Sequence, residues 1–398
     1  MNPNLALLHP YPFEKLATLF QGVTPPPDKK NIAWSIGEPK HPAPEFIAEI
    51  IQKEIAGLGT YPLTAGMPEL RDAIREWLIR RFGLLARSLD RDQHILPVNG
   101  TREALFAICQ FVVDAREQAL VMLPNPFYQI YEGATFLAGA TPHYLNLDPE
   151  TLLPDFDSVT PEQWQRTQLV YLSSPGNPSG AIFSAEQMQK LIRLSDQFSF
   201  VIASDECYSE IYPDENNPPC GLLQAAAMIG RHDYKNCLVF HSLSKRSSLP
   251  GMRSGFVAGD AELIKGFKLY RTYHGCAMPP PFQKASIAAW GDEEHVKKNR
   301  DLYREKFRKV SSIVGDLLPI KQPGGAFYLW PETPFDDCQF ARQLLEQQNL
   351  TVLPGSYLSR EVDGCNPGKN RVRMALVAPL AECEEGAHRF LKQKKEQS

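Results

Sequence analysis

The sequence predicts an α/β fold, with a large domain built on a mostly parallel, doubly wound sheet and a smaller α+β domain. Three observations predict it. Between about residues 95 and 240, short apolar runs alternate with helical segments. These runs are apolar at every position, which is typical of strands buried on both faces of a parallel sheet. Near residue 285 the pattern changes to a long charged helix and two isolated strand-like runs.

The first 100 residues are expected to contain an arm, a helix and the first strand. Prolines at positions 10, 12 and 25–27 punctuate residues 1–40, so we expect an extended arm with little regular structure. A helix is predicted over residues 68–82, with Pro68 in its first turn and Gly83 at its end. Four apolar residues share one face of that helix: Leu70, Ile74, Trp77 and Leu78.

The central elements follow the order strand, helix, strand. Strands are expected at residues 95–98, 119–123, 169–172, 200–203 and 238–240. A helix between the third and fourth of these is capped by Ser184, with Gln187 completing a capping box. Its inner face is expected to hold Met188, Leu191, Ile192 and Phe198. This order implies a right-handed crossover and therefore a doubly wound domain.

After residue 290 the chain is expected to form the smaller domain. A helix over about 294–318 carries apolar residues at helical intervals, Leu317 among them, and strands are expected at 324–330 and 371–376. We therefore divide the chain into residues 1–50 (arm and part of the small domain), 51–290 (large domain) and 291–398 (small domain). A length of 398 residues is sufficient for two such domains.

Charge and composition narrow the functional class. The formal charge is −4 with both signs interspersed, so neither nucleic acid nor an anionic membrane surface is expected as the main partner. No apolar run approaches the roughly 18 residues of a spanning helix, and the start lacks the pattern of a secretion signal. The eight cysteines are scattered without metal-ligand spacing, so we expect reduced thiols, a cytoplasmic protein and no metal site.

A lysine motif carries the first chemical signal. Lys245 follows the apolar run 238–240 closely, between Ser242 and Ser244 on one side and Arg253 on the other. An amine, two hydroxyls and a guanidinium on one short segment suit pyridoxal phosphate, because the amine can form a Schiff base with its aldehyde while the other groups bind its phosphate. A solvated loop lysine is the alternative explanation for this segment alone.

Further polar residues lie at the predicted carboxyl ends of strands, where ligands bind in doubly wound sheets. Gly100 and Thr101 open a helix after the strand at 95–98, which suits a phosphate cradle as well as an ordinary helix cap. Asn177 lies in a proline-bounded loop that aims an amide at a ligand or forms a simple Asx turn. Asp205 and Tyr208 follow the strand at 200–203, where the aspartate could hold a cation or cap a helix.

The joint order of these motifs resembles a known family. Asn-Gly-Thr at 99–101, Tyr128, Pro-Gly-Asn-Pro at 175–178, Asp205 with Tyr208, Ser242 with Lys245, and late arginines occur in the order typical of class I/II aminotransferases of pyridoxal phosphate fold type I. The resemblance runs from about Trp34 to Phe390. Including the segment at 9–16, the chain is most similar to bacterial N-succinyldiaminopimelate aminotransferases. It implies an aspartate aminotransferase-like fold whose large domain binds pyridoxal 5′-phosphate.

The resemblance also implies roles for the catalytic residues. Lys245 would hold the cofactor and then move a proton between substrate and cofactor, while Asp205 would pair with the pyridine nitrogen. Asn177 and Tyr208 would hydrogen-bond the phenolate oxygen of the cofactor. Tyr128 would stack on its ring, although many relatives carry tryptophan there.

Phosphate and substrate contacts are implied in the same way. The cofactor phosphate would be bound by Gly100, Thr101, Arg102, Ser242, Ser244 and Arg253, and by Tyr61 from the opposite subunit of a homodimer with shared active sites. Of these, Arg102 follows the motif without clearly belonging to it. Arg373 would bind the substrate α-carboxylate, with Arg371 as the competing candidate two residues earlier. Asn177 and the backbone of Gly37 would also contact the substrate.

The expected reaction is transamination of N-succinyl-LL-2,6-diaminopimelate with 2-oxoglutarate, by ping-pong kinetics through pyridoxamine phosphate, in lysine biosynthesis. Other class I aminotransferases, of aspartate, alanine, aromatic or acetylornithine type, share the same motifs and stay open, as does a pyridoxal phosphate lyase or decarboxylase. A regulatory module that binds the cofactor is a further alternative. It would require an added basic helix-turn-helix segment, and none precedes residue 34 in this sequence.

Overall fold

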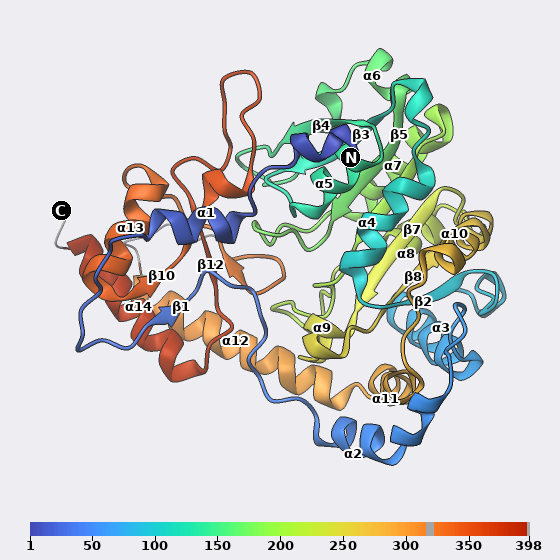
Figure 1. Cartoon of the computed structure of the whole chain (residues 1–398), viewed down its shortest axis with the longest axis horizontal. Helices are drawn as coiled ribbons and strands as arrows, with labels where there is room; N and C mark the ends of the chain where they lie inside the picture. Colours follow the sequence, from blue (N-terminus) through green and yellow to red (C-terminus); the bar gives the residue numbers. More distant parts are fainter. Residues whose placement is uncertain (316–321, 396–398) are drawn as a thin grey trace.

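The computed structural model describes residues 1–315 and 322–395, and its centre is a seven-stranded sheet (Figure 1). The strands are β2 (Ile95–Val98), β3 (Leu120–Asn125), β4 (Thr141–Asn146), β5 (Thr167–Ser173), β6 (Val201–Asp205), β7 (Cys237–Ser242) and β8 (Gly255–Gly259). Their spatial order is β2-β8-β7-β6-β5-β3-β4. Only β8 is antiparallel to its neighbours in this sheet, so the predicted mostly parallel, doubly wound α/β sheet is confirmed.

Helices cover both faces of this sheet (Figure 1). They are α2 (Glu45–Lys53), α3 (Pro68–Phe82), α4 (Thr101–Val112), α5 (Ile130–Leu137), α6 (Pro161–Arg166), α7 (Ala185–Phe198), α8 (Leu222–Met228), α9 (Leu243–Arg246), α10 (Ala261–His274) and α11 (Pro280–Gly291). One core joins the sheet to α3, α7, α8 and α11, and a second core joins its other face to α4, α5 and α10.

The inner strands are largely apolar because successive side chains enter different cores, whereas the edge strand β4 is polar and partly exposed. In β5, Leu169 and Tyr171 pack in the core with α4, whereas Val170 and Leu172 pack in the core with α7. Side chains alternate between the faces of a strand, so a strand covered on both sides needs apolar residues at every position.

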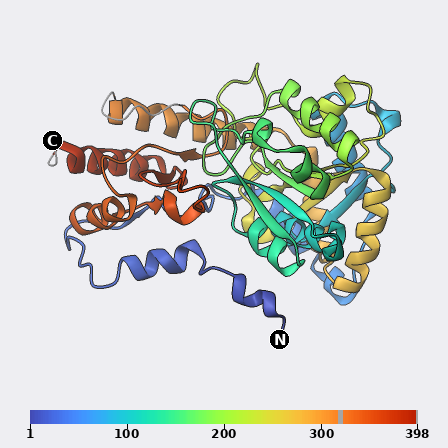
Figure 2. The same ribbon diagram turned by 90° about the horizontal axis from the view of Figure 1, so that it is seen from above.

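A smaller unit packs beside the large sheet (Figures 1 and 2). It comprises α1 (Pro12–Leu19), β1 (Ile32–Ala33), α12 (Glu294–Val314), β9 (Tyr328–Leu329), α13 (Asp337–Gln348), β10 (Leu350–Thr351), β11 (Leu353–Pro354), β12 (Val372–Ala375) and α14 (Leu380–Lys395). Strands β11, β12 and β9 form an antiparallel sheet, and β1 pairs in parallel with β10. The segment from α1 to β1 therefore belongs structurally with the C-terminal part of the chain, whereas η1 packs against α5 of the large unit.

Short 3₁₀ turns complete the secondary structure of the described residues. They are η1 (Pro3–Leu7), η2 (Ile55–Gly59), η3 (Ala86–Ser88), η4 (Ala115–Glu117), η5 (Phe156–Ser158), η6 (Pro250–Met252) and η8 (Gly355–Leu358).

The predicted helices at 68–82 and 185–198 are confirmed. Pro68 begins α3 and Gly83, with φ +62°, ends it. Ser184 accepts a hydrogen bond from the Gln187 backbone N–H, as a capping box requires. The helix predicted from residue 294 is confirmed as α12, which ends at Val314, where Gly315 leaves helical geometry with φ +54°. Residues 316–318 of that prediction, Leu317 among them, lie outside the described residues.

Two other predictions were wrong. The arm contains α1 and η1, because Pro12 occupies the first turn of α1 and the Glu14 carboxylate accepts the Tyr11 N–H at 3.3 Å. The strand predicted over 324–330 shortens to Tyr328–Leu329. The backbone just before Tyr328 forms hydrogen bonds with loops of the large unit and not with a neighbouring strand. Gly325 N–H donates to Gly180 O and Ala326 N–H donates to Ile211 O, each at 3.0 Å.

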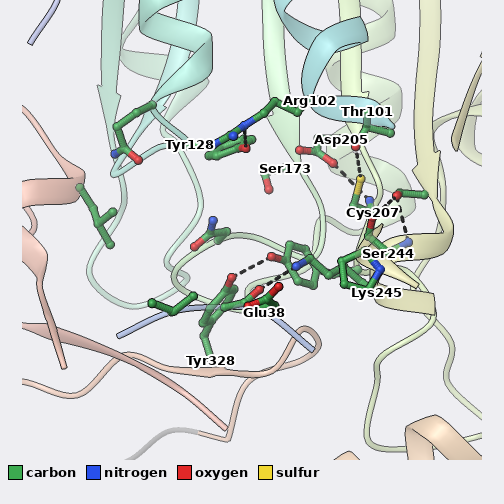
Figure 3. Close-up of a pocket in the computed structure, with 18 of the residues that line it drawn as sticks. Glu38, Thr101, Arg102, Tyr128, Ser173, Asp205, Cys207, Ser244, Lys245 and Tyr328 are labelled. Atoms are coloured by element: carbon green, nitrogen blue, oxygen red, sulfur yellow. Dashed lines mark hydrogen bonds between the residues drawn. The ribbon is translucent and has the colours of Figure 1, made fainter. Parts of the chain in front are cut away.

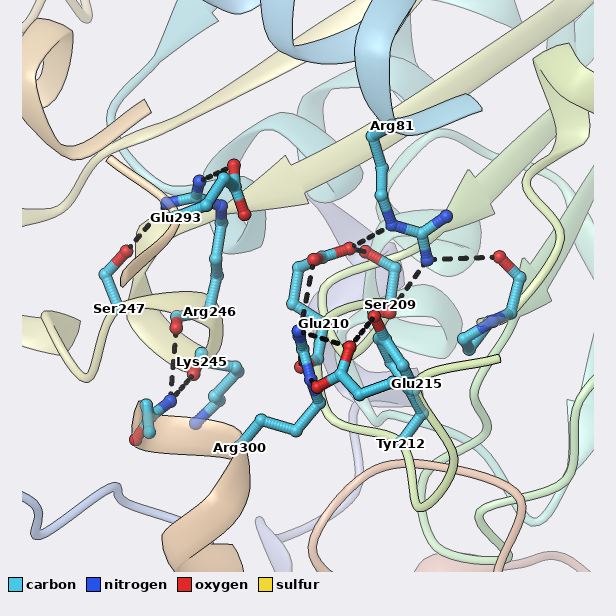
Figure 4. A network of polar contacts seen from close by, with 12 residues as sticks. Arg81, Ser209, Glu210, Tyr212, Glu215, Lys245, Arg246, Ser247, Glu293 and Arg300 are labelled. Carbon is cyan, nitrogen blue, oxygen red and sulfur yellow. Dashed lines mark hydrogen bonds and ion pairs between the residues drawn. The ribbon is translucent and has the colours of Figure 1, made fainter. Parts of the chain in front are cut away.

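Buried ion pairs connect the two units (Figure 4). The Glu210 carboxylate accepts from Arg81 Nε at 2.7 Å, and Glu210 O accepts from Arg300 Nη1 at 2.9 Å. Arg300 also pairs with Glu215 at 2.9 Å and lies 4.2 Å from the centre of the Tyr212 ring. Helix α3, helix α12 and the turn after Tyr208 are thereby held together.

Within the described residues, no helix combines the length and apolarity needed to cross a lipid bilayer. All eight cysteines carry free thiols. The domain boundaries at residues 50 and 290 stay a proposal; residue 50 lies within α2, and residue 290 lies near the end of α11.

Candidate active site

A cavity of about 430 Å³ opens where the carboxyl ends of the sheet strands face the smaller unit (Figure 3). The large sheet contributes the ends of β5, β6 and β7 and the start of α4, whereas the smaller unit contributes residues near β9, β11 and β12. Of the residues singled out in the sequence, the lining includes Gly37, Thr101, Arg102, Tyr128, Asn177, Asp205, Tyr208, Ser242, Ser244, Lys245, Arg253 and Arg373. Motifs distant in sequence therefore meet in one cavity.

Lys245 projects into the cavity from the one-turn helix α9. Its Nζ donates to Gly37 O at 2.7 Å and lies 5.2 Å from the centre of the Phe327 ring. Burial lowers the pKa of Lys245 to about 8, and the cations of Arg373 and Arg253 act in the same direction. A neutral, nucleophilic amine is therefore accessible near neutral pH.

Asp205 is the last residue of β6 and is only 7 % exposed. Its carboxylate accepts the Tyr131 hydroxyl at 2.7 Å and the Cys207 backbone N–H at 3.2 Å. Burial raises the pKa of Asp205, although these hydrogen bonds oppose the rise. A carboxylate so placed gains from a cation that enters the cavity beside it.

Several hydrogen-bond donors surround the N-terminus of α4. Gly100 precedes that helix with φ +78°, and a Cβ there would lie 2.3 Å from Arg253 Nη2. The Ser242 and Ser244 hydroxyls lie 2.9 Å apart, and Ser244 is buried. Among the described residues, Arg253 pairs with no carboxylate. Arg253 Nη1 donates to Pro250 O at 3.0 Å. A helix N-terminus, hydroxyls and a guanidinium without an acidic partner form a site for a phosphate group.

Arg373 and Asn177 lie together on another wall of the cavity. Arg373 Nη1 donates to Asn177 Oδ1 at 3.0 Å, and Nη2 donates to Ser35 O at 2.8 Å. The Arg373 guanidinium lies 4.7 Å from the centre of the Tyr328 ring, whose hydroxyl is 2.8 Å from that of Tyr208. Of the two late arginines, Arg373 lines the cavity.

Arg371 lies outside this lining. Its guanidinium donates to Trp330 O at 3.1 Å and pairs with the Glu332 carboxylate. Arg371, the competing candidate for binding the substrate α-carboxylate, is therefore held by these contacts at the edge of the small sheet.

Arg102 and Tyr128 form a further wall (Figure 3). Arg102 Nε donates to the Tyr128 hydroxyl, and Arg102 Nη2 donates to the Tyr11 hydroxyl, each at 2.7 Å. The Arg102 guanidinium is therefore directed to these two phenols. Tyr61 is 98 % exposed and does not line the cavity of its own chain.

Sequence reasoning missed several residues of this site. Tyr131 was given no role, and Cys207, whose thiol lies 3.0 Å from the Thr101 hydroxyl, was not singled out. Tyr11, Glu38 and Tyr328 also line the cavity. Tyr131 follows Tyr128 by nearly one helical turn, which is the one local signal that could have indicated it.

These residues fit pyridoxal phosphate. A buried carboxylate suits the protonated ring nitrogen, the cradle at Gly100 suits the phosphate, and the amine of Lys245 suits the aldehyde. The cavity thus combines the groups that bind this cofactor with an arginine, Arg373, placed to bind a carboxylate.

Comparison with known proteins agrees with this chemistry. The family model "Aminotransferase class I and II" matches residues 29–390. The chain is 48 % identical to an aminotransferase of known structure from Neisseria meningitidis, with a TM-score of 0.95 over 98 % of this chain and 99 % of that one. It is 35 % identical to the aminotransferase AspB of Helicobacter pylori, with a TM-score of 0.89 over 98 % and 99 % of the two chains.

A curated relative is 30 % identical over 96 % of this chain and 95 % of its own length; it is the LL-diaminopimelate aminotransferase of Desulforudis audaxviator. Fold, site and comparisons together define a pyridoxal phosphate enzyme of fold type I. The chain belongs to the class I and II aminotransferases. It is therefore an enzyme that uses this cofactor to transfer an amino group between an amino acid and a 2-oxo acid, and the family, fold and cofactor predicted from the sequence are confirmed.

Proposed function

We propose that the protein transfers the amino group of N-succinyl-LL-2,6-diaminopimelate to 2-oxoglutarate, as a cytoplasmic homodimer in lysine biosynthesis. The observation that carries the substrate assignment is Arg102, a cation in the cavity wall with no carboxylate partner among the described residues. The names of curated relatives, LL-diaminopimelate aminotransferases, support the diaminopimelate skeleton.

Lys245 and Asp205 are proposed as the residues that perform the chemistry. When bound, pyridoxal phosphate supplies an electron sink for the carbanion formed at the substrate α-carbon. Lys245 would hold the cofactor covalently and, once displaced by the substrate amine, accept the α-proton at Nζ. Its lowered pKa of about 8 supports that role. Asp205 would keep the ring nitrogen protonated, and Tyr208 and Asn177 would donate to the ring oxygen.

The phosphate would be bound by Gly100, Thr101, Ser242, Ser244 and Arg253, with Tyr61 of a second copy reaching the same group. Arg373 would bind the α-carboxylate, because it lines the cavity and its hydrogen bonds to Asn177 Oδ1 and Ser35 O hold the guanidinium in the cavity wall. Gly37 would cover the substrate with its backbone.

Arg102 would then bind the distal end of the substrate. Succinylation replaces the distal ammonium of diaminopimelate by a neutral amide and adds a carboxylate, so the distal end becomes more negative. Once Lys245, Arg373 and Arg253 are used, Arg102 is the basic residue left among the described residues that line the cavity, and the Tyr11 hydroxyl beside it offers a hydrogen bond. This arrangement favours the succinylated substrate.

Unmodified LL-diaminopimelate is the second candidate, favoured by the names of the curated relatives. Glu38 also lines the cavity and is the acid that would bind a free distal ammonium. The two candidates differ in which of Arg102 and Glu38 governs affinity.

The cofactor assignment is tested by borohydride reduction and peptide mapping. We expect the yellow protein to lose its absorption band and the reduced cofactor to be found on Lys245. A label on another lysine would overturn the assigned roles.

The substrate assignment is tested by steady-state kinetics with 2-oxoglutarate as acceptor. We expect kcat/KM to be higher for the succinylated substrate, and Arg102→Gln to raise its KM about tenfold through loss of one charge-assisted contact. Arg371→Gln, outside the cavity, serves as the matched control. A preference for LL-diaminopimelate with sensitivity to Glu38→Gln would establish the second candidate, and a strong preference for the oxaloacetate, pyruvate, aromatic or acetylornithine reaction would refute both.

A further inference from the structure

A row of polar side chains on α12 lies next to α9, the short helix that carries Lys245. Asn299, Tyr303 and Lys306 occupy successive turns of this helix and are all buried. Lys306 is only 2 % exposed, and no carboxylate within residues 1–315 and 322–395 forms an ion pair with it. A buried lysine without an acid is rare in proteins, so this row calls for a functional explanation.

Two members of the row, Lys306 and Asn299, are joined through His41 in one continuous hydrogen-bond chain to the backbone of Lys245, and the Tyr303 ring packs against His41 with 4.4 Å between ring centres. Lys306 Nζ lies 2.6 Å from His41 Nε2 and donates to Val377 O at 3.2 Å. His41 Nδ1 lies 2.7 Å from Asn299 Oδ1. Asn299 Nδ2 donates to the carbonyls of Lys245 and Arg246, each at 3.1 Å, two residues that Figure 4 shows side by side.

The direction of every bond in this chain follows from the ammonium. Burial lowers the pKa of His41 to about 4, so its ring is neutral and carries a single N–H. An ammonium only donates, so His41 Nε2 accepts and Nδ1 carries the hydrogen. That hydrogen is donated to Asn299 Oδ1, which turns the amide nitrogen of Asn299 toward the two carbonyls.

The chain fastens two parts of the active site to the same helix. One is the segment 36–41, here named the roof segment, which lines the cavity with Ile36, Gly37 and Glu38. The other is the short helix α9 that carries Lys245. The two also contact each other, since Lys245 Nζ donates to Gly37 O at 2.7 Å and the Ser248 hydroxyl donates to His41 O at 2.8 Å.

Stability alone does not explain a lysine at this position. Burial lowers the pKa of Lys306 to about 8, which means that the folded state disfavours its charge. Methionine has a similar length and no charge to desolvate, and apolar replacements of buried charges are often neutral or stabilising. A costly residue beside an active site is typical of a trade of stability for function.

We propose that Lys306 is a positioning residue that, through His41 and Asn299, holds the roof segment over Lys245. The proposal rests on the proposed role of Lys245 as the reacting amine. Substrate that enters the cavity would meet a roof already in place, so less of its binding energy is used to order the segment.

The proposal is tested with Lys306→Met, using Lys309→Met as the matched control. Lys309 lies on the same helix, and its ion pair with Glu384 is partly exposed. In the purified holoenzyme we expect amide hydrogen exchange in residues 34–41 to become about tenfold faster in Lys306→Met and to stay unchanged in Lys309→Met. We also expect the KM for the amino donor to rise about fivefold with little change in kcat, because the loss falls on binding.

The melting temperature distinguishes positioning from a structural role. We expect that of Lys306→Met to equal or exceed the original value, and Lys306→Gln, which keeps a donor without the charge, to recover part of the exchange protection. A lower melting temperature with unchanged exchange at 34–41 would overturn the proposal. Should Lys306→Met fail to fold, Asn299→Leu breaks the same chain at its other end, and unchanged exchange there would refute it equally. If borohydride reduction did not attach the cofactor to Lys245, the proposed function would be wrong. The effect of Lys306→Met on amide hydrogen exchange at residues 34–41 would still be measured independently.

Discussion

At the scale of single residues, burial acts on the two central groups of the site in opposite directions. It lowers the pKa of the Lys245 amine and raises that of the Asp205 carboxyl. Both groups are thereby moved toward their neutral forms. A ligand that brings a reactive aldehyde to Lys245 and a protonated nitrogen to Asp205 therefore supplies what each environment lacks.

The lowered pKa of Lys245 predicts the pH dependence of cofactor binding. Only the neutral amine attacks an aldehyde, so the rate at which protein freed of cofactor takes up pyridoxal phosphate should rise with pH and level off above about 8. The rate is measured from the growth of absorbance after mixing. A rise that continues toward about 10.4, the value of an exposed lysine, would contradict the desolvated environment.

Most residues of the site could be predicted at this scale, and a few could not. Lys245, Asp205 and Asn177 lie in short motifs after apolar runs, so their position at strand ends was readable from the sequence. Tyr328 was not, because it lies in the small sheet and reaches Tyr208 only after the two units pack. Such residues are defined by tertiary neighbours and carry no local pattern.

At the scale of elements, α12 holds the site through its ion pairs as well as its polar row. Glu210 is 3 % exposed, and although burial alone would raise its pKa, the cations of Arg81, Arg246 and Arg300 lower it. A carboxyl whose pKa is lower in the folded state stabilises the protein above its unfolded pKa. That contribution to stability is lost as the pH falls through the pKa that the carboxyl has in the folded state.

Glu210→Gln should therefore destabilise the protein strongly at neutral pH. Removing one partner leaves buried arginine charge uncompensated, which costs about 3–5 kcal/mol. Glu215→Gln is the control, because Glu215 pairs with Arg300 at the surface with its side chain 41 % exposed, and its loss should cost about 1 kcal/mol or less. Chemical denaturation monitored by fluorescence measures both, and equal losses would show that burial of Glu210 is unimportant.

Elements were predicted best where a local rule determines them. Helix α7 begins at its capping box and α3 ends at its glycine, as expected. The strand predicted at 324–330 was too long because its backbone bonds to distant loops. Strand β8 was not predicted, because its apolar run from Phe256 to Ala258 is short and bounded by glycines. In the arm, Pro12 was treated as a helix breaker although it occupies the first turn of α1.

At the scale of the whole molecule, a single copy of the chain exposes an apolar stretch around Tyr61 to solvent. Leu58 and Leu63 are largely exposed, and Tyr61 between them has almost its entire surface in solvent. Exposed apolar stretches of this kind are typical of interfaces. The stretch supports the proposed homodimer in which Tyr61 completes the site of the second copy.

Mixed dimers test that sharing. Lys245→Ala and Tyr61→Ala proteins should each be impaired alone, whereas unfolding and refolding them together should restore about a quarter of the original activity. Half of the dimers formed are then mixed, and each mixed dimer holds one intact site. Activity no greater than the sum of the separate variants would show that Tyr61 does not act across an interface.

The parallel pair of β1 and β10 constrains how the protein is made. Ile32 pairs with Leu350, so the segment around residue 32 has no partner until residue 350 has been synthesised. During translation the large sheet can close while the arm is still unpaired. Truncation before β10 would therefore leave β1 in the N-terminal arm without its partner strand. The backbone that follows β1 and contacts Lys245 would lose its anchor as well.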